Sequence, residues 1–160
     1  MTGALSGALA TVTMSAVMLA GEKAGLMPGQ PPKHIVRGLL PGSDRRPKPG
    51  ERPLGALAHL GFGVTFGAAF ALLSRDPARR VPFGVAYALA IWAVSYQGWV
   101  PRLSLLPPIA RDLTGRPAVM AAGHVVYGAT LAALLNRFEP AGGSPAREEL
   151  AQKESQPAFS

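Results

Sequence analysis

Long uncharged stretches dominate the pattern of hydrophobic and polar positions along this chain. Within them Ala, Gly, Leu and Val follow one another without the alternation of a half-buried strand. Each stretch has roughly the twenty residues that a helix needs to cross a hydrocarbon core of about 30 Å. The stretches without any Asp, Glu, Lys or Arg are Thr2–Gly21, Leu54–Ser74, Val81–Val100 and Pro117–Asn136. This pattern predicts an all-α integral membrane protein with four transmembrane helices.

We therefore expect one transmembrane domain followed by a polar tail. A soluble bundle is disfavoured, because helices without a polar face leave no surface for water. The tail is rich in Gly, Ser, Pro, Glu and Gln and has too little apolar surface to order itself. The expected parts are a domain at residues 1–138, with helices at about 2–21, 54–74, 81–100 and 117–137, and a disordered tail at 139–160.

The first long connection contains the prolines that should end any helix there, because proline lacks an amide hydrogen and clashes with the preceding turn. These are Pro28, Pro31 and Pro32. Residues 33–40 mix basic and apolar side chains, as a short interfacial segment does. Residues 41–51 have the composition of a solvated loop.

The segment that begins at His59 recurs at His124, 65 positions later. Both copies read His-x-x-aromatic-Gly-x-Thr-apolar-small-Ala. Each copy follows a helix and a loop with a Pro-Pro pair, and the first loop is longer by the segment 41–51. A unit of two spans returns to the side from which it started, so the order predicts two parallel two-helix repeats.

Composition and charge agree with a membrane protein. Apolar residues make up 48% of the chain and charged residues 16%, whereas a soluble domain has nearer a quarter charged. The net charge of +7 lies in loops and has no recognition helix or zinc spacing beside it, so we expect no nucleic acid partner. The two proline loops hold 10 of the 16 Lys and Arg, which favours a cytoplasmic location for these loops. There is no cysteine, which excludes disulfides and thiolate metal sites.

Candidate functional residues gather on the proline-loop side. His59 and His124 lie at similar depth, roughly 10 Å into their helices. His34, Tyr96 and Gln97 belong to the same side of the membrane. Small residues beside each histidine predict close helix packing, since they let a neighbouring backbone approach. The residues expected to pack are Gly63, Gly67, Thr65, Gly128 and Thr130.

Three interpretations of the histidines stay open. Each imidazole can hydrogen-bond a carbonyl, a hydroxyl or Gln97 of an adjacent helix, because an unpaired polar group in hydrocarbon is costly. His59 and His124 can bind haem or, with His34, a metal ion. The pair can also sense pH, since histidine titrates between about pH 5 and 8. Apart from these alternatives we expect no cofactor.

Conventional catalysis finds little support in the sequence. There is no Ser-His-acid order with a nucleophile elbow, no phosphate-binding glycine loop and no HExxH. The uncharged stretches offer no carboxylate for a proton relay. Glu22 and Asp112 are expected to be solvated loop charges. We assign no catalytic residue and favour a protein that is not an enzyme.

The arrangement resembles that of small bacterial inner-membrane proteins of unknown function, the YagU-like (DUF1440-type) group. The resemblance rests on the four-span layout, on the loop with Gly25–Pro28 and Pro31-Pro32, and on the His-x-x-aromatic-Gly helices at His59 and His124. It covers roughly residues 1–137. It implies a multi-pass protein of the bacterial inner membrane with a role in stress, and it brings no known catalytic residues.

Three functional hypotheses follow. The first is a non-enzymatic membrane protein, related to envelope or acid stress, that packs with itself or with a membrane protein partner in the lipid bilayer. The second is a haem- or metal-binding membrane subunit that uses His59 and His124. The third is a small dimeric transporter or channel.

Overall fold

The computed structural model describes residues 1–42, 46–103, 105–112 and 115–139. Every regular element in this part of the chain is a helix, which confirms the all-α prediction. The expected tail lies outside the described residues, apart from Glu139. The long helices are α1 (Thr2–Lys23), α3 (Glu51–Leu73), α4 (Arg80–Val94) and α6 (Gly115–Phe138). The shorter elements are α2 (Pro31–Leu39), the π-helical turn η1 (Ser95–Trp99), α5 (Val100–Arg102) and the 3₁₀ turn η2 (Ile109–Arg111).

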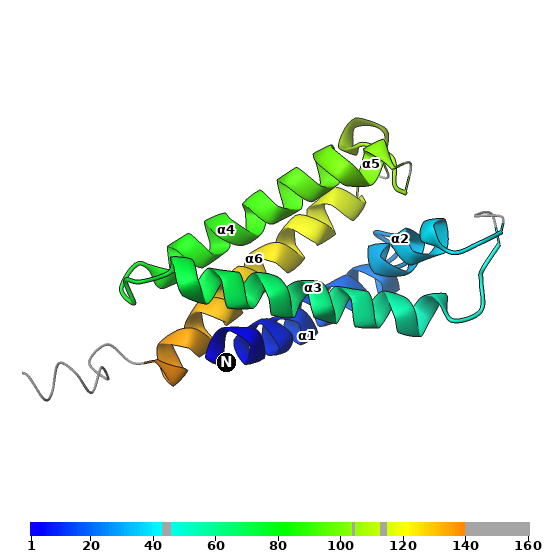
Figure 1. Cartoon of the computed structure of the whole chain (residues 1–160). Coiled ribbons are helices and arrows are strands. Elements are labelled where there is room, and N and C mark those ends of the chain that lie inside the picture. Colours follow the sequence, from blue (N-terminus) through cyan, green and yellow to red (C-terminus); the bar gives the residue numbers. More distant parts are fainter. Residues whose placement is uncertain (43–45, 104, 113–114, 140–160) are drawn as a thin grey trace, which may run out of the picture.

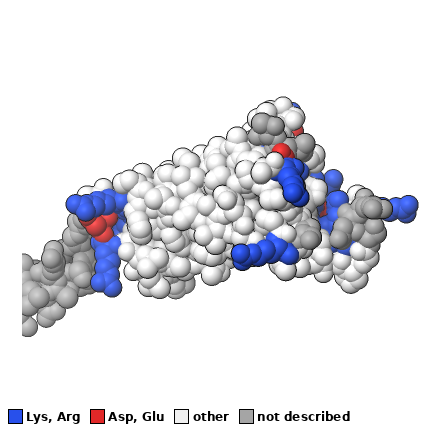
Figure 2. Space-filling view, turned by 90° about the horizontal axis from the view of Figure 1, so that it is seen from above, with Lys and Arg blue, Asp and Glu red and all other residues white. Residues whose placement is uncertain are grey.

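Three of these helices, α1, α3 and α6, are long and apolar enough to cross a membrane. The fourth expected helix, residues 81–100, is divided by η1, where the Val100 amide bonds the carbonyl of Ser95, five residues back. α4 alone has 15 residues, but α4, η1 and α5 follow one another without a gap from Arg80 to Arg102. The Lys, Arg, Asp and Glu side chains on the face seen in Figure 2 gather toward the two ends of the molecule and leave an uncharged middle.

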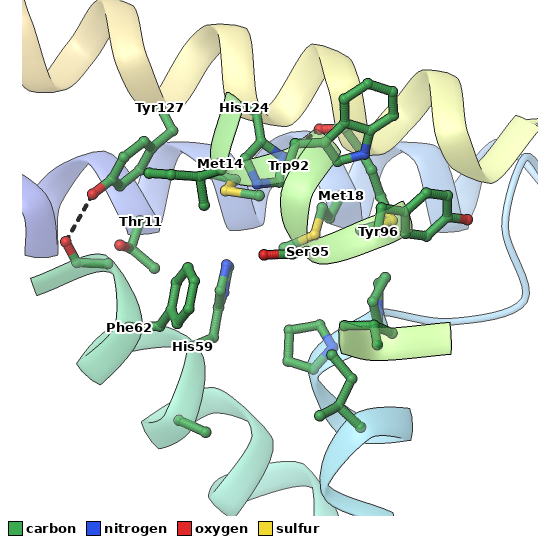
Figure 3. A pocket seen from close by; sticks show the side chains of 18 of the residues that line it. Thr11, Met14, Met18, His59, Phe62, Trp92, Ser95, Tyr96, His124 and Tyr127 are labelled. Atoms are coloured by element: carbon green, nitrogen blue, oxygen red, sulfur yellow. Dashed lines mark hydrogen bonds between the residues drawn. The ribbon is translucent and has the colours of Figure 1, made fainter. Parts of the chain in front are cut away.

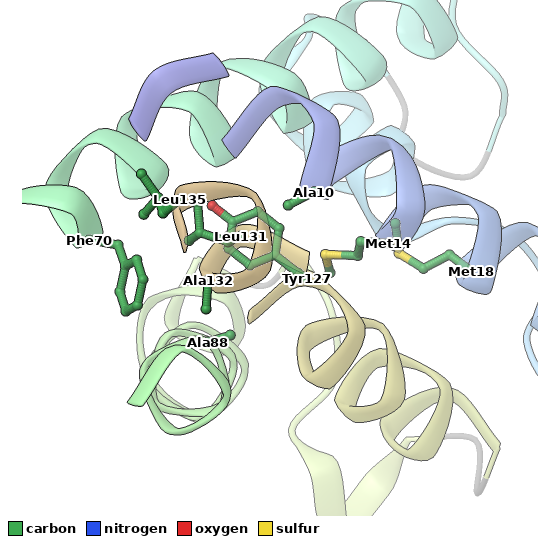
Figure 4. Close-up of a cluster of buried hydrophobic side chains, with 9 residues drawn as sticks. All are labelled: Ala10, Met14, Met18, Phe70, Ala88, Tyr127, Leu131, Ala132 and Leu135. Atoms are coloured by element: carbon green, nitrogen blue, oxygen red, sulfur yellow. The ribbon is translucent and has the colours of Figure 1, made fainter. Parts of the chain in front are cut away.

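The helices form a bundle in which α1 and α6 pack against each other and α3 and α4 flank them. α3 packs on α1, and α4 packs on α6. Figure 1 shows that α1 and α4 run from one end of the bundle to the other, and that α3 and α6 run back. α3 meets α4 through aromatic rings, with centroids of Phe70 and Tyr87 5.2 Å apart. The main core lies between these helices (Figure 4) and contains Ala10, Met14, Met18, Phe70, Ala88, Tyr127, Leu131, Ala132 and Leu135.

α2 corrects the expectation that the prolines of the first loop only end helices. Pro31 and Pro32 begin this helix, since the first turn of a helix needs no amide donor and a φ near that of proline suits it. Its end is tied to the start of α3 by Arg37, whose Nε donates to Glu51 Oε2 at 2.6 Å. The Lys48 ammonium donates to the carbonyls of Arg37 and Leu40, at 2.6 Å each. Glu51 is therefore buried at the start of α3 and is not part of a solvated loop.

The opposite end of the bundle is closed by a buried arginine. Arg80, at the start of α4, donates from Nε to the Ser74 hydroxyl at 3.0 Å and from Nη1 to the Asn136 side-chain oxygen at 3.2 Å. Its Nη2 donates to the Ser74 carbonyl at 3.2 Å. These bonds give each guanidinium nitrogen a partner and hold the turn between α3 and α4 against the end of α6.

Candidate functional site

A cavity of about 180 Å³ lies inside the bundle, near the end where α2 and α5 are located. Its wall comes from all four long helices and from α2 and η1, and it is mainly apolar. The polar side chains on this wall include His59, Ser95 and His124. Figure 3 shows His59 of α3 and His124 of α6 on opposite sides of the pocket, with Met14, Met18 and Trp92 between and beside them. This cavity is the candidate functional site.

His59 reaches the pocket from the part of α3 that faces α1. Its Nδ1 lies 3.4 Å from the Ser15 hydroxyl of α1. The hydroxyl of Ser15 also donates to the Thr11 carbonyl, one turn earlier in its own helix, at 2.8 Å. The single hydrogen of the Ser15 hydroxyl is therefore donated within α1. The contact between this hydroxyl and the His59 imidazole is long. The His59 ring remains available to a further partner in the pocket.

His124 is held more firmly. Its Nδ1 donates to the carbonyl of Met120, one turn earlier in α6, at 2.7 Å. A neutral imidazole that donates from Nδ1 has its lone pair on Nε2, so it offers an acceptor to a polar group in the pocket. The two histidines thus differ: one ring is fixed by its own helix, and the other touches a neighbouring helix.

Tyr96 has a different role from the expected one. Its ring is buried and lines the pocket, while its hydroxyl bonds the carboxylate of Asp112. Asp112 in turn accepts from Arg116 Nη1 at 2.6 Å, and the two side chains are 1% and 8% exposed. Asp112 is therefore a buried partner of two side chains and not the solvated loop charge that the sequence suggested. It anchors the loop after α5 to α6 and fixes the end of the pocket.

Two expected site residues lie away from the pocket. Gln97 is exposed and is not on the pocket wall, so it does not bond either pocket histidine. His34 lies in α2 next to Lys33, and burial together with the charges of Lys33, Arg37 and Arg116 holds the pKa of its imidazole below the ordinary value. Its Nε2 is buried, with no hydrogen-bond partner among the described residues. Within the described ranges, no three His, Asp or Glu side chains converge on a metal position.

The expected packing residues divide between two helix contacts. A Cβ on Gly67 would lie 2.6 Å from Gly7 Cα and 2.6 Å from Gly3 O, so α3 and α1 touch backbone to backbone. Gly63 lies in the same contact. A Cβ on Gly84 of α4 would lie 2.6 Å from the carbonyl of Gly128 in α6, which makes a second contact of the same kind.

The two threonines behave differently from each other. Thr130 lies in the contact between α6 and α1, where its hydroxyl is 3.4 Å from that of Thr13. Thr65 is exposed and donates to the carbonyl of Gly61 in its own helix at 2.9 Å. The prediction that Thr65 packs against another helix is therefore wrong, because α3 turns this face away from α1 and α4.

The lining of the cavity suits the binding of a small molecule. Imidazole, hydroxyl and indole groups line a mainly apolar space, and no Asp or Glu side chain is among the described residues of its wall. A cavity of about 150 Å³ lined by apolar side chains stays dry and holds benzene in another protein. The present cavity has the size and lining for a small apolar molecule.

Comparison with known proteins gives a family without an assigned role. No curated protein and no solved structure matches the chain. A family described as "Family of unknown function (DUF6789)" matches residues 1–145. The chain belongs to this family of unknown function.

Proposed function

We propose that the protein is a non-enzymatic, multi-pass membrane protein that binds a small apolar molecule between its two histidine helices. The observation behind this proposal is the mainly apolar cavity of about 180 Å³ with His59 and His124 on its wall. A mainly apolar cavity in a membrane domain favours a lipid-soluble guest, because such a guest reaches it from the bilayer without crossing water. The imidazoles then select for a guest with a hydrogen-bonding group.

Tryptophan fluorescence tests this proposal, because both tryptophans of the chain, Trp92 and Trp99, line the pocket. The Trp99→Phe variant leaves Trp92 as a single reporter. In lipid nanodiscs, bromobenzene should quench Trp92 along a saturable curve. Filling the pocket with Ala58→Phe should remove the saturable part, whereas Ala86→Phe, on an exposed position of α4 away from the pocket, should keep it. Quenching that rises linearly and equally in all variants would refute the proposal.

We further propose that α4, η1 and α5 together form a fourth membrane span, giving two parallel two-helix units in a bacterial inner membrane. Support comes from the unbroken helical path from Arg80 to Arg102, from the parallel directions of α1 and α4, and from the glycine contact within each pair. The basic loops would lie in the cytoplasm, and the likeness to YagU-like proteins suggests a role in stress.

Cysteine labelling tests this topology, because the natural chain has no cysteine. In intact cells a membrane-impermeant maleimide should label a cysteine at the exposed position Arg79. Single cysteines at the exposed positions Leu39 and Leu103 should react only after the membrane is permeabilised, that is, from the other side. Labelling of Leu39→Cys and Leu103→Cys from opposite sides would exclude the fourth span.

A second candidate function is a haem- or metal-binding subunit. It is favoured by one observation, the presence of His59 and His124 on the wall of one cavity. An absorption spectrum with elemental analysis of the purified protein, beside the His59→Ala/His124→Ala variant, decides it. A Soret band or a stoichiometric metal that the variant lacks would support it; a colourless, metal-free protein expressed with ample haem would exclude it.

A further inference from the structure

A second hollow, which we call the α1–α3 groove, lies on the side of the molecule where α1 and α3 separate. Its volume is about 830 Å³, and its lining is more polar than that of the histidine pocket. α1 and α3 touch through Gly7 and Gly67 at one end. At the other end α2 packs closely on α3, since a Cβ on Gly55 of α3 would lie 3.0 Å from the backbone of Lys33. The start of α2 therefore forms part of the groove wall, through Pro32 and Lys33.

The charged residues of the groove lie at its α2 end. They are three cations, Lys23, Lys33 and Arg52, and one carboxylate, Glu22, which leaves a charge of +2. Lys33 and Glu22 form a long ion pair of 3.7 Å. Within the described part of the chain, Lys23 and Arg52 are exposed and no ion pair involves them. The mouth of the groove is thus suited to an anion.

Farther from this end the groove carries no charged residue, and apolar side chains line it together with Thr11, Ser15 and His59. Leu19 and Val12 follow on α1, and Ala56 and Leu60 follow on α3. The eleven residues from Lys23 back to Val12 correspond to about 16 Å along a helix. This is about half of a hydrocarbon core of roughly 30 Å, that is, the depth of one leaflet.

The groove thus has cations at its mouth and apolar side chains farther along. We propose that it binds one anionic phospholipid, with its phosphate at Lys33 and Arg52 and an acyl chain along Val12 and Leu60. Basic pockets beside membrane-spanning helices bind anionic headgroups through the attraction of Lys and Arg to phosphate. Free inorganic phosphate shares the headgroup's charge, but it has nothing to place in the apolar half of the groove. The groove and the histidine pocket share Thr11, Pro32 and His59 on their walls, but none of the four charged residues of the groove lines the pocket. The lipid site therefore goes beyond the function proposed above.

Native mass spectrometry of the detergent-purified full chain tests the site. Phosphatidylglycerol and phosphatidylcholine with identical acyl chains are added in turn, and the retained lipid is measured. Phosphatidylglycerol should be retained in preference. Each cation near a membrane surface is worth about fivefold in affinity, so Lys33→Gln/Arg52→Gln should weaken phosphatidylglycerol binding by about 30-fold. The matched control is Arg75→Gln/Arg79→Gln, which removes two exposed cations at the opposite end and should change little.

Two further measurements distinguish binding of a lipid from binding of a soluble anion. Ala56→Phe fills the apolar half of the groove at unchanged charge and should also weaken phosphatidylglycerol binding, whereas the exposed Ala86→Phe should not. Inorganic phosphate at millimolar concentration should leave the bound lipid in place. The proposal is overturned if both lipids are retained equally, if the opposite-end variant loses as much binding, if Ala56→Phe has no effect, or if phosphate displaces the lipid.

Discussion

The hydroxyl of Tyr127 donates to the carbonyl oxygen of Gly63 at 2.7 Å (Figure 3), and this bond joins the two copies of the repeated sequence directly. Tyr127 stands three residues after His124, and Gly63 stands four residues after His59. The position that corresponds to Tyr127 in the first copy is Phe62, which has no hydroxyl and is 38% exposed. Phe62 therefore cannot make the equivalent bond from the first copy to the second. The bond of Tyr127 closes the histidine pocket on one side.

Removing this hydroxyl should weaken the contact between α3 and α6. We expect Tyr127→Phe to lower the free energy of unfolding by about 1 kcal/mol, the net worth of a typical buried hydrogen bond. Unfolding of the purified protein in mixed micelles measures the change. Phe62→Tyr, which adds a hydroxyl at an exposed ring, should have almost no effect. Equal losses in both variants would mean that the bond is unimportant.

The backbone contact between α1 and α3 should not accept a methyl group. Gly67→Ala should destabilise the protein and separate the two helices, because the added Cβ would lie 2.6 Å from Gly7 Cα. Gly61→Ala is the matched control on the same helix, since nothing lies within 4 Å of its Cβ. The control should be neutral or more stable by up to about 1 kcal/mol, because alanine favours helix more than glycine does. Thermal unfolding in detergent compares them, and a Gly67→Ala protein as stable as the control would contradict the packing.

The buried pair of Asp112 and Arg116 should be costly to break. Asp112→Asn leaves the guanidinium without its charged partner, and the expected loss is about 3 to 5 kcal/mol. Asp76 and Arg79 provide the comparison, since their side chains are 57% and 88% exposed at a distance of 3.6 Å. Asp76→Asn should cost less than about 1 kcal/mol. Similar losses from both substitutions would show that Asp112 is solvated after all.

The free energy of unfolding should decrease as the pH falls, partly because of His34. Its pKa is lowered in the folded protein, chiefly by burial and then by the charge of Lys33, whereas the unfolded chain titrates near about 6.5. Between the two values the unfolded state binds more protons, so the contribution of His34 is present above about pH 6.5 and is lost as the pH falls through the folded pKa. The melting temperature should drop more between pH 7.5 and 5.5 in the natural protein than in His34→Gln. Parallel pH profiles would refute this role.

Much of the fold was predictable because uncharged stretches of twenty residues have few alternatives to a long helix. The sequence places the start of α3 too late, at Leu54, because the composition of residues 41–51 gives no sign that Arg37 pairs with Glu51 and that Glu51 is buried. The pattern does not predict α2 as a helix, although Pro31 and Pro32 suit a first helical turn as well as a break.

The candidate site was only partly predictable, because η1 changes the helical register. A π-helical turn contains an extra residue, so side chains beyond Ser95 rotate away from the faces that a regular α-helix would give them. Tyr96 is buried and Gln97 is exposed in this turn. The bond between Tyr96 and Asp112 spans a loop of irregular path, and the sequence offered only the spacing of four between Asp112 and Arg116 as a sign of it.

The most direct test of the central claim is a set of intermolecular nuclear Overhauser effects between unlabelled benzene and the isotope-labelled protein in micelles. The account predicts contacts from benzene to the Trp92 indole, to the imidazoles of His59 and His124, and to the Met14 methyl, all on the pocket wall. Contacts confined to outward-facing side chains such as Leu72 and Val94 would show that benzene stays in the surrounding detergent, and would contradict a binding pocket between the two histidine helices.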